Sequence, residues 1–451
     1  MNRFFALISF ILIMFPACAF AQAFEFQLTS KVSEHHKDKV GEGAKTEIKT
    51  KEESSIIIFE PEKISVRTGN NEKIYDFDKK TLTFIAHDKK QFTETSLYAI
   101  PAFKDFEKRN REMLLGAMQN AGITAVQSTP FELEAIFGDN SKTEAGQKIQ
   151  TIEHTGGYKF LYDGEDVTAY AVSDQAIRDE LKDSYKKYLI YEHTIHPAIL
   201  ENMAGRNIFN SLSYRNKQEV PFLTEKNFTV SAFNNAPSST IAVPQDYQKN
   251  YGFDERLDKV IKMSLTEKEK TVDDYAAEMN KLLEDKQYLE ASLVFHEYAT
   301  HTGGKDIDKI KAIIQRIFSE APAEEGVQQL AAAISQPPSS KEHLQKAIEI
   351  IEAVRSKNTP HSYVLNIYLA NYVDVLGQTA KAQDLILEAL EKNPFIAGAY
   401  KDLGDKYFKS FHMQDAWTSW NQMRSINTGY PLATPVNELE MQILEKHPVY
   451  F

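Results

Sequence analysis

Residues 363–427 read YVLNIYLANYVDVLGQTAKAQDLILEALEKNPFIAGAYKDLGDKYFKSFHMQDAWTSWNQMRSIN, and one pattern of small and apolar residues occurs in them twice, 34 residues apart. The first copy holds Leu369, Ala370, Val373, Ala382, Ile386, Ala389 and Pro394, and the second holds Leu403, Gly404, Tyr407, Ala416, Trp420, Met423 and Thr428. Only the final proline is not repeated. A period of this length, with small residues where helices cross, is typical of helix–turn–helix repeats that stack on one another.

The pattern resembles the tetratricopeptide repeat (TPR). The resemblance implies that helix packing rests on Leu369, Ala370, Ala382, Ala389, Pro394, Leu403, Gly404, Tyr407 and Ala416. It also implies that the first helix of each pair lines a concave groove that binds a protein partner. The positions expected to be exposed there are Ile367, Asn371, Asp374, Lys401, Asp405 and Lys409. The alternative is that these six are ordinary solvated helix positions.

The helical part is predicted to extend from residue 271 to residue 451. Apolar residues from Tyr275 to Tyr298 indicate a degenerate repeat of the same kind, which ends at Gly303. A last helix at 438–446 is expected to cap the stack, because the final repeat otherwise leaves an apolar face uncovered. Residues 251–270 are polar and weakly patterned, which predicts a linker.

The first 21 residues have the pattern of a secretory signal peptide, with Arg3, a following apolar run and a cleavage point after Ala21. A retained membrane anchor is the alternative, although the run is short for a bilayer span. Residues 15–18 resemble a bacterial lipoprotein processing box, but Phe15 and Pro16 depart from its pattern; lipidation of Cys18 is therefore a second alternative. We expect a periplasmic or secreted protein, or else one anchored to the envelope by lipid.

Composition excludes some classes of protein. The chain has 451 residues, enough for two or three domains, and its 52 basic and 64 acidic residues give a net charge of −12. Such a balance disfavours nucleic-acid binding, which needs clustered cations. Cys18 is the single cysteine, so the processed chain is expected to have neither a disulfide nor a cysteine metal site.

Residues 22–250 are predicted to form a β-rich domain. Short strand-like runs separated by turn residues predict an antiparallel meander over residues 24–97. An amphipathic helix at 103–121 is expected to cover one face of the sheet. Further strands are expected at 148–153, 158–162, 168–172, 228–233 and 239–243, around a helical region at 174–203 that is broken near Pro197.

Four segments of this domain, 74–85, 88–94, 155–159 and 243–247, carry a second resemblance. They are similar to bacterial envelope domains related to the periplasmic lipoprotein carriers, in which a Gly-Tyr segment opens a strand and Val-Pro-x-x-Tyr ends the domain. The resemblance implies a half-barrel wrapped around helices, with a concavity that holds acyl chains in several members. The alternative is an interior filled by side chains, as in most small barrels.

Two histidine pairs raise the question of a metal site. His296 and His301 are five apart, about 140° around a helix, whereas a metalloprotease pair is four apart. We expect them at the edge of a repeat. His193 and His196 could share a face near Glu192, but with no third ligand identified we expect solvent-exposed residues.

Other motifs are incomplete. His35 and His36 are expected in a charged loop. Residues 302–305 lack the leading glycine and the final Ser or Thr of a phosphate loop. Residues 139–144 contain Asp139, Ser141, Thr143 and Glu144, but they lack the central glycine and distant glutamate of a calcium loop. The sequence therefore predicts no catalytic residues, no metal and no cofactor.

The chain ends in the apolar residues Val449, Tyr450 and Phe451. We expect this end to fold onto the capping helix. Capture of a free terminus by an envelope peptide-recognition domain is the alternative.

Together these patterns predict an α+β protein: an N-terminal antiparallel curved sheet or half-barrel with packed helices, followed by an all-α TPR-like solenoid. The expected function is non-enzymatic binding of a protein partner at the bacterial cell envelope. One alternative is a carrier of a lipid or other hydrophobic ligand in the N-terminal domain. The other is a metal-dependent hydrolase that uses His193, His196 and Glu192.

Overall fold

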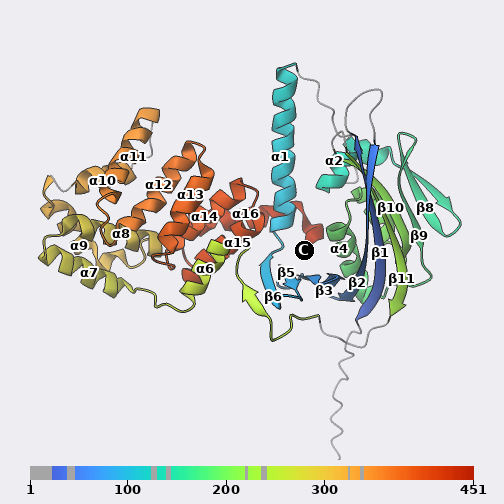
Figure 1. Cartoon of the computed structure of the whole chain (residues 1–451), viewed down its shortest axis with the longest axis horizontal. Helices are drawn as coiled ribbons and strands as arrows, with labels where there is room; N and C mark the ends of the chain where they lie inside the picture. The colour runs from blue at the N-terminus through green and yellow to red at the C-terminus, as the bar shows by residue number, and fades with distance from the viewer. Residues whose placement is uncertain are drawn as a thin grey trace, which may run out of the picture.

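The computed structural model describes residues 23–37, 46–122, 130–138, 144–218, 222–234, 241–323, 326–335 and 340–451. The expected signal peptide with Cys18 and Ala21, and the residues Asp139, Ser141 and Thr143, lie outside this described part. A curved sheet with its own helices forms the N-terminal half, and a long series of helices forms the C-terminal half (Figure 1). The α+β class is confirmed.

The N-terminal half is built on one twelve-stranded sheet with the spatial order β12-β6-β5-β4-β3-β2-β1-β11-β10-β9-β8-β7. Strands β1–β6 are sequential neighbours, so the predicted meander is confirmed; β7–β11 form a second meander, joined to the first by the antiparallel pair β1–β11. The bounds are β1 (Phe24–Lys37), β2 (Thr46–Glu60), β3 (Lys63–Thr68), β4 (Asn71–Asp76), β5 (Thr81–Ala86), β6 (Gln91–Ser96), β7 (Gln150–His154), β8 (Gly157–Tyr162), β9 (Glu165–Val172), β10 (Phe209–Gln218), β11 (Phe222–Asn234) and β12 (Gln248–Asn250).

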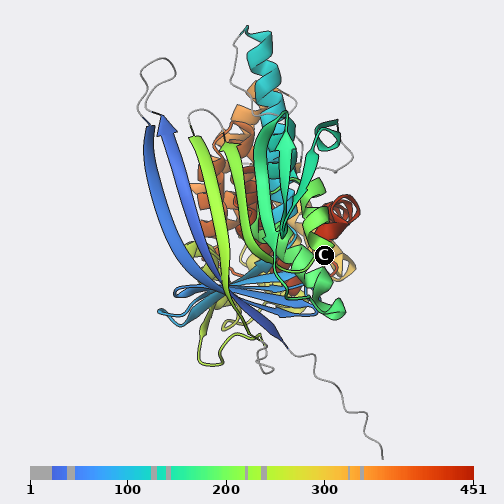
Figure 2. The ribbon, with the colours of Figure 1, turned by 90° about the vertical axis from the view of Figure 1, so that its right-hand side faces the viewer.

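Helices α4 (Lys182–Glu192) and α5 (Pro197–Ala204) belong to this half, and α4 lies against β2 and β3 on the inside of the curve (Figures 1 and 2). The alternation of the strands points Phe26 and Phe59 inward. Both rings meet Tyr188 of α4 edge-on, with centroids 5.8 and 5.5 Å away. The predicted break near Pro197 is confirmed, because α4 ends at Glu192 and α5 begins at Pro197.

Helix α1 (Ala99–Asn120) does not cover the sheet as predicted. It projects from the junction between the two halves (Figure 1). Its base packs through Phe103 and Phe106 against Phe411 of the helical half, with ring centroids 6.0 and 4.7 Å apart. Farther along, Met113 and Leu114 are 66% and 61% exposed. The prediction is wrong because aromatic side chains of the other half cover the apolar base of α1.

Two smaller predictions for this half are also wrong, and one strand was not predicted. His35 and His36 lie within β1 rather than in a loop, because β1 and β2 pair as far as Lys37. Of the strand expected at 239–243, residues 239–240 lie outside the described part and residues 241–243 form no strand; Ile241 instead packs against Ile74 and Ile85. Strand β10 was not expected, because polar residues dominate its sequence. The remaining helices here are α2 (Pro130–Phe137) and α3 (Glu144–Gln147).

The helical half contains the two copies of the 34-residue pattern as two helical hairpins, α12–α13 and α14–α15. Their second helices begin at Thr379 and Met413, 34 residues apart. The helices are α6 (Glu255–Ser264), α7 (Val272–Glu284), α8 (Tyr288–Thr302), α9 (Lys311–Glu320), α10 (Val327–Ser335), α11 (Lys341–Arg355), α12 (Leu365–Val375), α13 (Thr379–Leu390), α14 (Ala397–Lys409), α15 (Met413–Ile426) and α16 (Thr434–Lys446).

All nine residues expected to carry helix packing are buried: Leu369, Ala370, Ala382, Ala389, Pro394, Leu403, Gly404, Tyr407 and Ala416. Gly404 shows why the pattern needs small residues. A Cβ atom there would lie 2.4 Å from the ring of Trp420 and 3.0 Å from the carbonyl oxygen of Ala416. Helices α14 and α15 therefore cross too closely for a larger side chain.

The segment expected to be a linker is largely part of the fold. Residues 255–264 form α6, whose Leu257, Val260 and Ile261 are buried in the core of the helical half. Arg256 adds an ion pair with Asp384, with 3.1 Å between nitrogen and oxygen. The linker prediction is wrong for this helix because its few apolar residues all lie on one face and meet α13 and α15.

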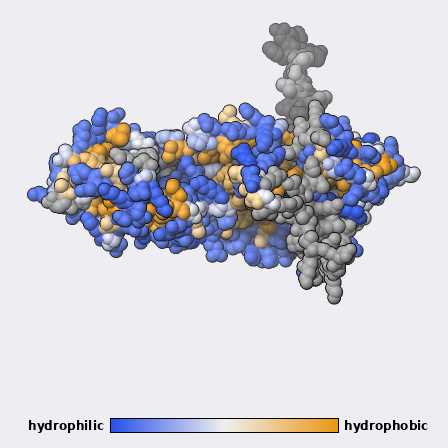
Figure 3. Space-filling view, turned by 90° about the horizontal axis from the view of Figure 1, so that it is seen from above, coloured by the Kyte–Doolittle hydropathy of each residue, from blue (hydrophilic) through white to orange (hydrophobic). Residues whose placement is uncertain are grey.

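The chain end lies at the junction of the halves and not on the cap alone. The Tyr450 hydroxyl accepts a hydrogen bond from Lys104 of α1 at 2.7 Å, and its carbonyl accepts one from Tyr191 of α4 at 2.9 Å. Phe451 packs on Tyr98, with 4.9 Å between centroids. These contacts hold Tyr450 and Phe451 against both halves of the molecule. Seen from above, the molecule is elongated and mainly hydrophilic, with scattered apolar patches (Figure 3).

Candidate binding cleft and the buried network beneath it

The surface expected to be a concave groove is partly occupied by the chain itself. Helix α8 packs against both α12 and α14: the ring of His296 meets Tyr368 at 5.5 Å, and the carbonyl of Thr300 would lie 2.9 Å from a Cβ atom at Gly398. The expectation that all six groove positions are exposed is wrong for Ile367 and Asp374, which are 2% and 9% exposed.

The charged members of that set bind one another. Lys409 donates to Asp374 at 2.7 Å, and Lys401 donates to Asp405 at 2.5 Å. Asn371 accepts a hydrogen bond from the buried Lys406 at 2.9 Å. These residues therefore connect α12 with α14 and form one further contact within α14. The sequence pattern found the two helices correctly, but it could not show that their charges are already paired.

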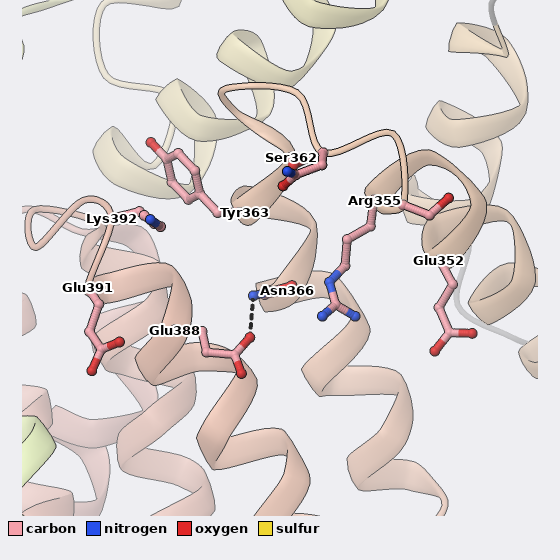
Figure 4. A pocket seen from close by; sticks show the side chains of 10 residues that line it. Glu352, Arg355, Ser362, Tyr363, Asn366, Glu388, Glu391 and Lys392 are labelled. Carbon is pink, nitrogen blue, oxygen red and sulfur yellow. Dashed lines mark hydrogen bonds between the residues drawn. The ribbon is translucent and has the colours of Figure 1, made fainter.

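An open cleft of about 630 Å³ lies elsewhere, where α11 ends beside the beginning of α12 and the end of α13 (Figure 4). This volume is within the range of about 300–1,000 Å³ that is usual for ligand sites. Arg355, Asn366 and Glu388 converge on one side of the cleft, while Glu391 and Lys392 come from the end of α13 (Figure 4). The lining residues are Glu352, Arg355, Ser356, Asn358, Ser362, Tyr363, Asn366, Glu388, Glu391 and Lys392.

Several polar groups of the cleft lack partners. Asn366 is 5% exposed; its amide nitrogen donates to Glu388 at 3.1 Å, but its amide oxygen has no donor within the described ranges. A buried acceptor left in this way costs about 1–3 kcal/mol, so a ligand donor would be favoured. Neither Arg355 nor Lys392 forms an ion pair with any residue that the structure describes.

None of these cleft residues belongs to the set expected from the sequence. They lie at helix ends, where the repeat pattern does not determine side-chain direction. One local signal exists: Asn366 interrupts the apolar run from Val364 to Ile367. A polar residue at a core position of a helix is a reason to look for a partner.

A buried polar network lies directly beneath the cleft, centred on Glu297 of α8. This side chain is 0% exposed and accepts hydrogen bonds from Tyr363 at 2.6 Å, Asn393 at 2.7 Å and Tyr275 at 3.1 Å. Tyr363 also lines the cleft. Since these three donors come from three separate segments and the acceptor comes from a fourth, α8, the network fixes the floor of the cleft.

His361 is a cation of this network, together with Lys270, which lies 3.5 Å from Glu297. Its Nδ1 lies 2.6 Å from Glu290, and its Nε2 lies 3.2 Å from Glu278 and 3.6 Å from Glu297. Burial alone would lower the pKa of His361, but these carboxylates outweigh burial and raise it to about 9. The hydrogen bond from His361, helped by Lys270 and opposed by burial, lowers the pKa of Glu278 to about 2. The pair is therefore charged at neutral pH.

This pairing predicts how stability depends on pH. The pKa of His361 is higher in the folded state than its unfolded value of about 6.5. Its contribution to the free energy of unfolding is therefore complete below pH 6.5 and is lost as the pH rises through about 9. The folded pKa of Glu278 is below its unfolded value, so its contribution is lost as pH falls from about 4.3 towards 2. Between pH 6 and pH 9.5, we expect the free energy of unfolding of the wild type to fall by about 3 kcal/mol more than that of His361→Gln, measured by urea unfolding. If the free energies of unfolding of the two proteins depended on pH in the same way, the assigned pairing of His361 would be contradicted.

The histidines of the first candidate metal pair are buried rather than at an edge. His296 packs beside Phe295 and Tyr368, and burial lowers its pKa to about 4. His301 bonds to Tyr275 at 3.0 Å and to Glu269 at 2.9 Å. The edge prediction is wrong because α8 is surrounded on several sides by other helices, which a repeat pattern alone does not reveal.

The second candidate pair is also buried rather than solvent-exposed. Burial lowers the pKa of His193 to about 3, and its ring lies among aromatic side chains. His196 stacks on Phe131 and bonds to Glu134 at 2.7 Å. Glu192 instead accepts hydrogen bonds from Lys73 and Tyr75. The three side chains expected for a hydrolase are therefore directed to three different sets of partners.

Within the described ranges, no three or more His, Cys, Asp or Glu side chains are grouped so that they could hold a metal ion. Among the helices that the structure describes, none is long and apolar enough to span a bilayer.

Among the described residues, buried side chains of the strands and of α4 and α5 pack together inside the curve of the sheet. A small cavity of about 70 Å³ lies between α4, α5 and the chain end, lined in part by Ile190, Ile195 and Leu200. This volume is far below the roughly 300 Å³ at which ligand sites usually begin. The observation favours the alternative in which side chains fill the half-barrel.

Comparison with known proteins gives no family. No family model matches the chain, and no curated protein matches it. Among solved structures, one titled "Lipid-protein interactions in lipovitellin" is similar at 10% identity and a TM-score of 0.23, covering 96% of this chain and 56% of that one. The chain thus spans about half the length of that structure, and a likeness this weak carries no argument about function.

Proposed function

We propose that this chain is a non-enzymatic binding protein of the bacterial cell envelope, in which a TPR-like helical half holds a protein partner. The cleft between α11, α12 and α13 supports this proposal most directly. It combines a suitable volume with two cations that have no ion pair in the described part of the chain, and with a buried amide oxygen that has no donor. The sheet half serves as the scaffold to which the stack is fixed.

The chemistry of the cleft favours a polypeptide. Small-molecule sites are usually lined by apolar and aromatic side chains, whereas this lining is mostly polar and charged. Arg355 and Lys392 can form ion pairs with acidic side chains of a partner, and Glu352 can form one with a basic side chain. A polypeptide segment that carries both acidic and basic side chains would pair with these groups. One of its backbone N–H groups would donate a hydrogen bond to the amide oxygen of Asn366. Complementary charge of this kind confers specificity and fast association.

Charge reversal tests this proposal. The double variant Arg355→Glu, Lys392→Glu is expected to weaken binding of a partner, isolated by crosslinking in intact cells, by about 10- to 100-fold at low salt. Lys346→Glu is the matched control: this exposed lysine is also on α11 but lies outside the cleft. Equal affinity of the double variant and the control, measured by calorimetry, would refute the cleft as the site.

A further inference from the structure

Strand β7 is an open edge of the sheet. It is the last strand in the spatial order and pairs with β8 alone. All five of its residues are exposed, including the apolar Ile152. The opposite edge, by contrast, is the three-residue strand β12. An edge strand presents unpaired backbone N–H and C=O groups, which makes β7 a template for another strand.

The direction of these backbone groups follows from the hairpin. His154 and Gly157 are paired across a two-residue turn, so His154, Ile152 and Gln150 direct their N–H and C=O groups to β8. Thr151 and Glu153 direct theirs outward. Strand β7 contains no proline, no lysine and no bulge, the features by which edges are commonly protected.

A second open cleft, of about 650 Å³, continues from the His154 end of this edge. The guanidinium of Arg206 lies 4.6 Å from the centroid of the Tyr158 ring, which holds it in place. It forms no ion pair with the residues that the structure describes, whereas the neighbouring Lys182 is paired with Asp179 at 2.5 Å. The lining residues are Glu153, His154, Gly156, Gly157, Tyr158, Val172, Ala176, Ile177, Asp179, Lys182, Gly205, Arg206 and Asn207.

We propose that β7 binds an extended peptide of another protein by strand addition, with a carboxylate of that peptide placed against Arg206. The backbone of Thr151 and Glu153 would hold the peptide, and Arg206 would select for an acidic residue or a carboxy-terminus. This surface is separate from the cleft of the helical half and does not depend on it.

Charge favours such a peptide over a second copy of the chain. Two β7 strands could pair antiparallel about Ile152, which places Thr151 of each copy opposite Glu153 of the other. This register, however, brings Lys148 of each copy opposite Gly156, at the cleft that contains Arg206 and Lys182. Lys148 then comes near Arg206, whose charge no carboxylate of the described residues pairs, so a self-paired edge is disfavoured, whereas an acidic peptide is not.

The test uses the full chain and a fluorescein-labelled peptide of ten residues, alternating valine and threonine and ending in glutamate with a free carboxylate. Fluorescence anisotropy is expected to show binding that Thr151→Pro weakens at least about tenfold, because an outward N–H is lost. Thr151→Val keeps that N–H and is expected to bind as wild type does. Arg206→Gln is expected to cost about tenfold with the free-acid peptide and nothing with its amidated, glutamine-ended twin.

Further outcomes decide the proposal. Two further peptides are compared, one methylated on the odd-numbered backbone nitrogens and the other on the even-numbered ones. Only one of the two is expected to lose binding, because only one set of N–H groups faces β7. This comparison tests the edge even if Thr151→Pro unfolds the chain. Equal binding of both methylated peptides would overturn strand addition. A wild-type dimer in light scattering that Thr151→Pro dissociates would identify a second copy as the occupant. The double variant Arg355→Glu, Lys392→Glu is expected to bind the peptide normally, so this test is independent of the helical cleft.

Discussion

Replacing Glu297 with alanine is expected to lower the free energy of unfolding by about 3–5 kcal/mol. The substitution removes a fully buried acceptor and leaves the donors of Tyr275, Tyr363 and Asn393 without their partner. It also removes one of the three carboxylates around His361. Because the network joins α7, α8, the turn before α12 and the turn after α13, its loss should loosen the floor of the cleft as well as the fold.

Urea unfolding followed by circular dichroism measures this effect. Glu297→Gln keeps one acceptor and is expected to cost less than Glu297→Ala. Glu284→Ala is the matched control, because Glu284 is an exposed glutamate at the end of α7, and a change within about 0.5 kcal/mol is expected. A cost for Glu297→Ala as small as that of the control would mean that the network contributes nothing to stability.

Gly404→Ala is expected to destabilise the protein by about 1–3 kcal/mol, as other overpacked core substitutions do. The added methyl group would meet the Trp420 ring at 2.4 Å and the backbone carbonyl of Ala416 at 3.0 Å. The ring can turn only at the expense of its own packing, and the carbonyl cannot move without shifting α15. The helices must therefore separate, which disturbs the second hairpin of the repeat.

Gly116→Ala provides the control for helix propensity. Gly116 lies within α1, and a Cβ atom there would have no atom within 4 Å. Alanine is expected to stabilise this helix by about 0.5–1 kcal/mol. Opposite signs for the two glycine substitutions, measured by thermal unfolding, would establish close helix crossing as the cause. A neutral or stabilising Gly404→Ala would contradict the assigned crossing.

The sequence predicted those features that depend on local pattern. The spacing of Ala382 and Ala416 predicted two hairpins of the same length, and the structure has them at those positions. The turn residues at 69–71, 78–80 and 88–90 predicted a run of short strands, and in the structure these turns separate β3, β4, β5 and β6. In both cases each element is specified by its own residues and their immediate neighbours.

The sequence could not predict features that depend on contacts between distant segments. The apolar face of α1 gave no indication that Phe411 would cover its base, since that residue lies about 300 positions later. Nor could the repeat pattern show that α8 lies against α12 and α14, which buries His296 and occupies part of the expected groove. The cleft was missed for the same reason, because its residues meet only after three helices have packed.

The central claim is that the cleft between α11, α12 and α13 binds a protein. Site-specific photo-crosslinking in intact cells tests it most directly, with the crosslinking amino acid placed at Glu352 in the cleft or at Lys346 on another face of α11. We predict a discrete adduct with one protein from position 352 and none from position 346. No adduct from position 352, or the same adducts from both positions, would contradict the claim.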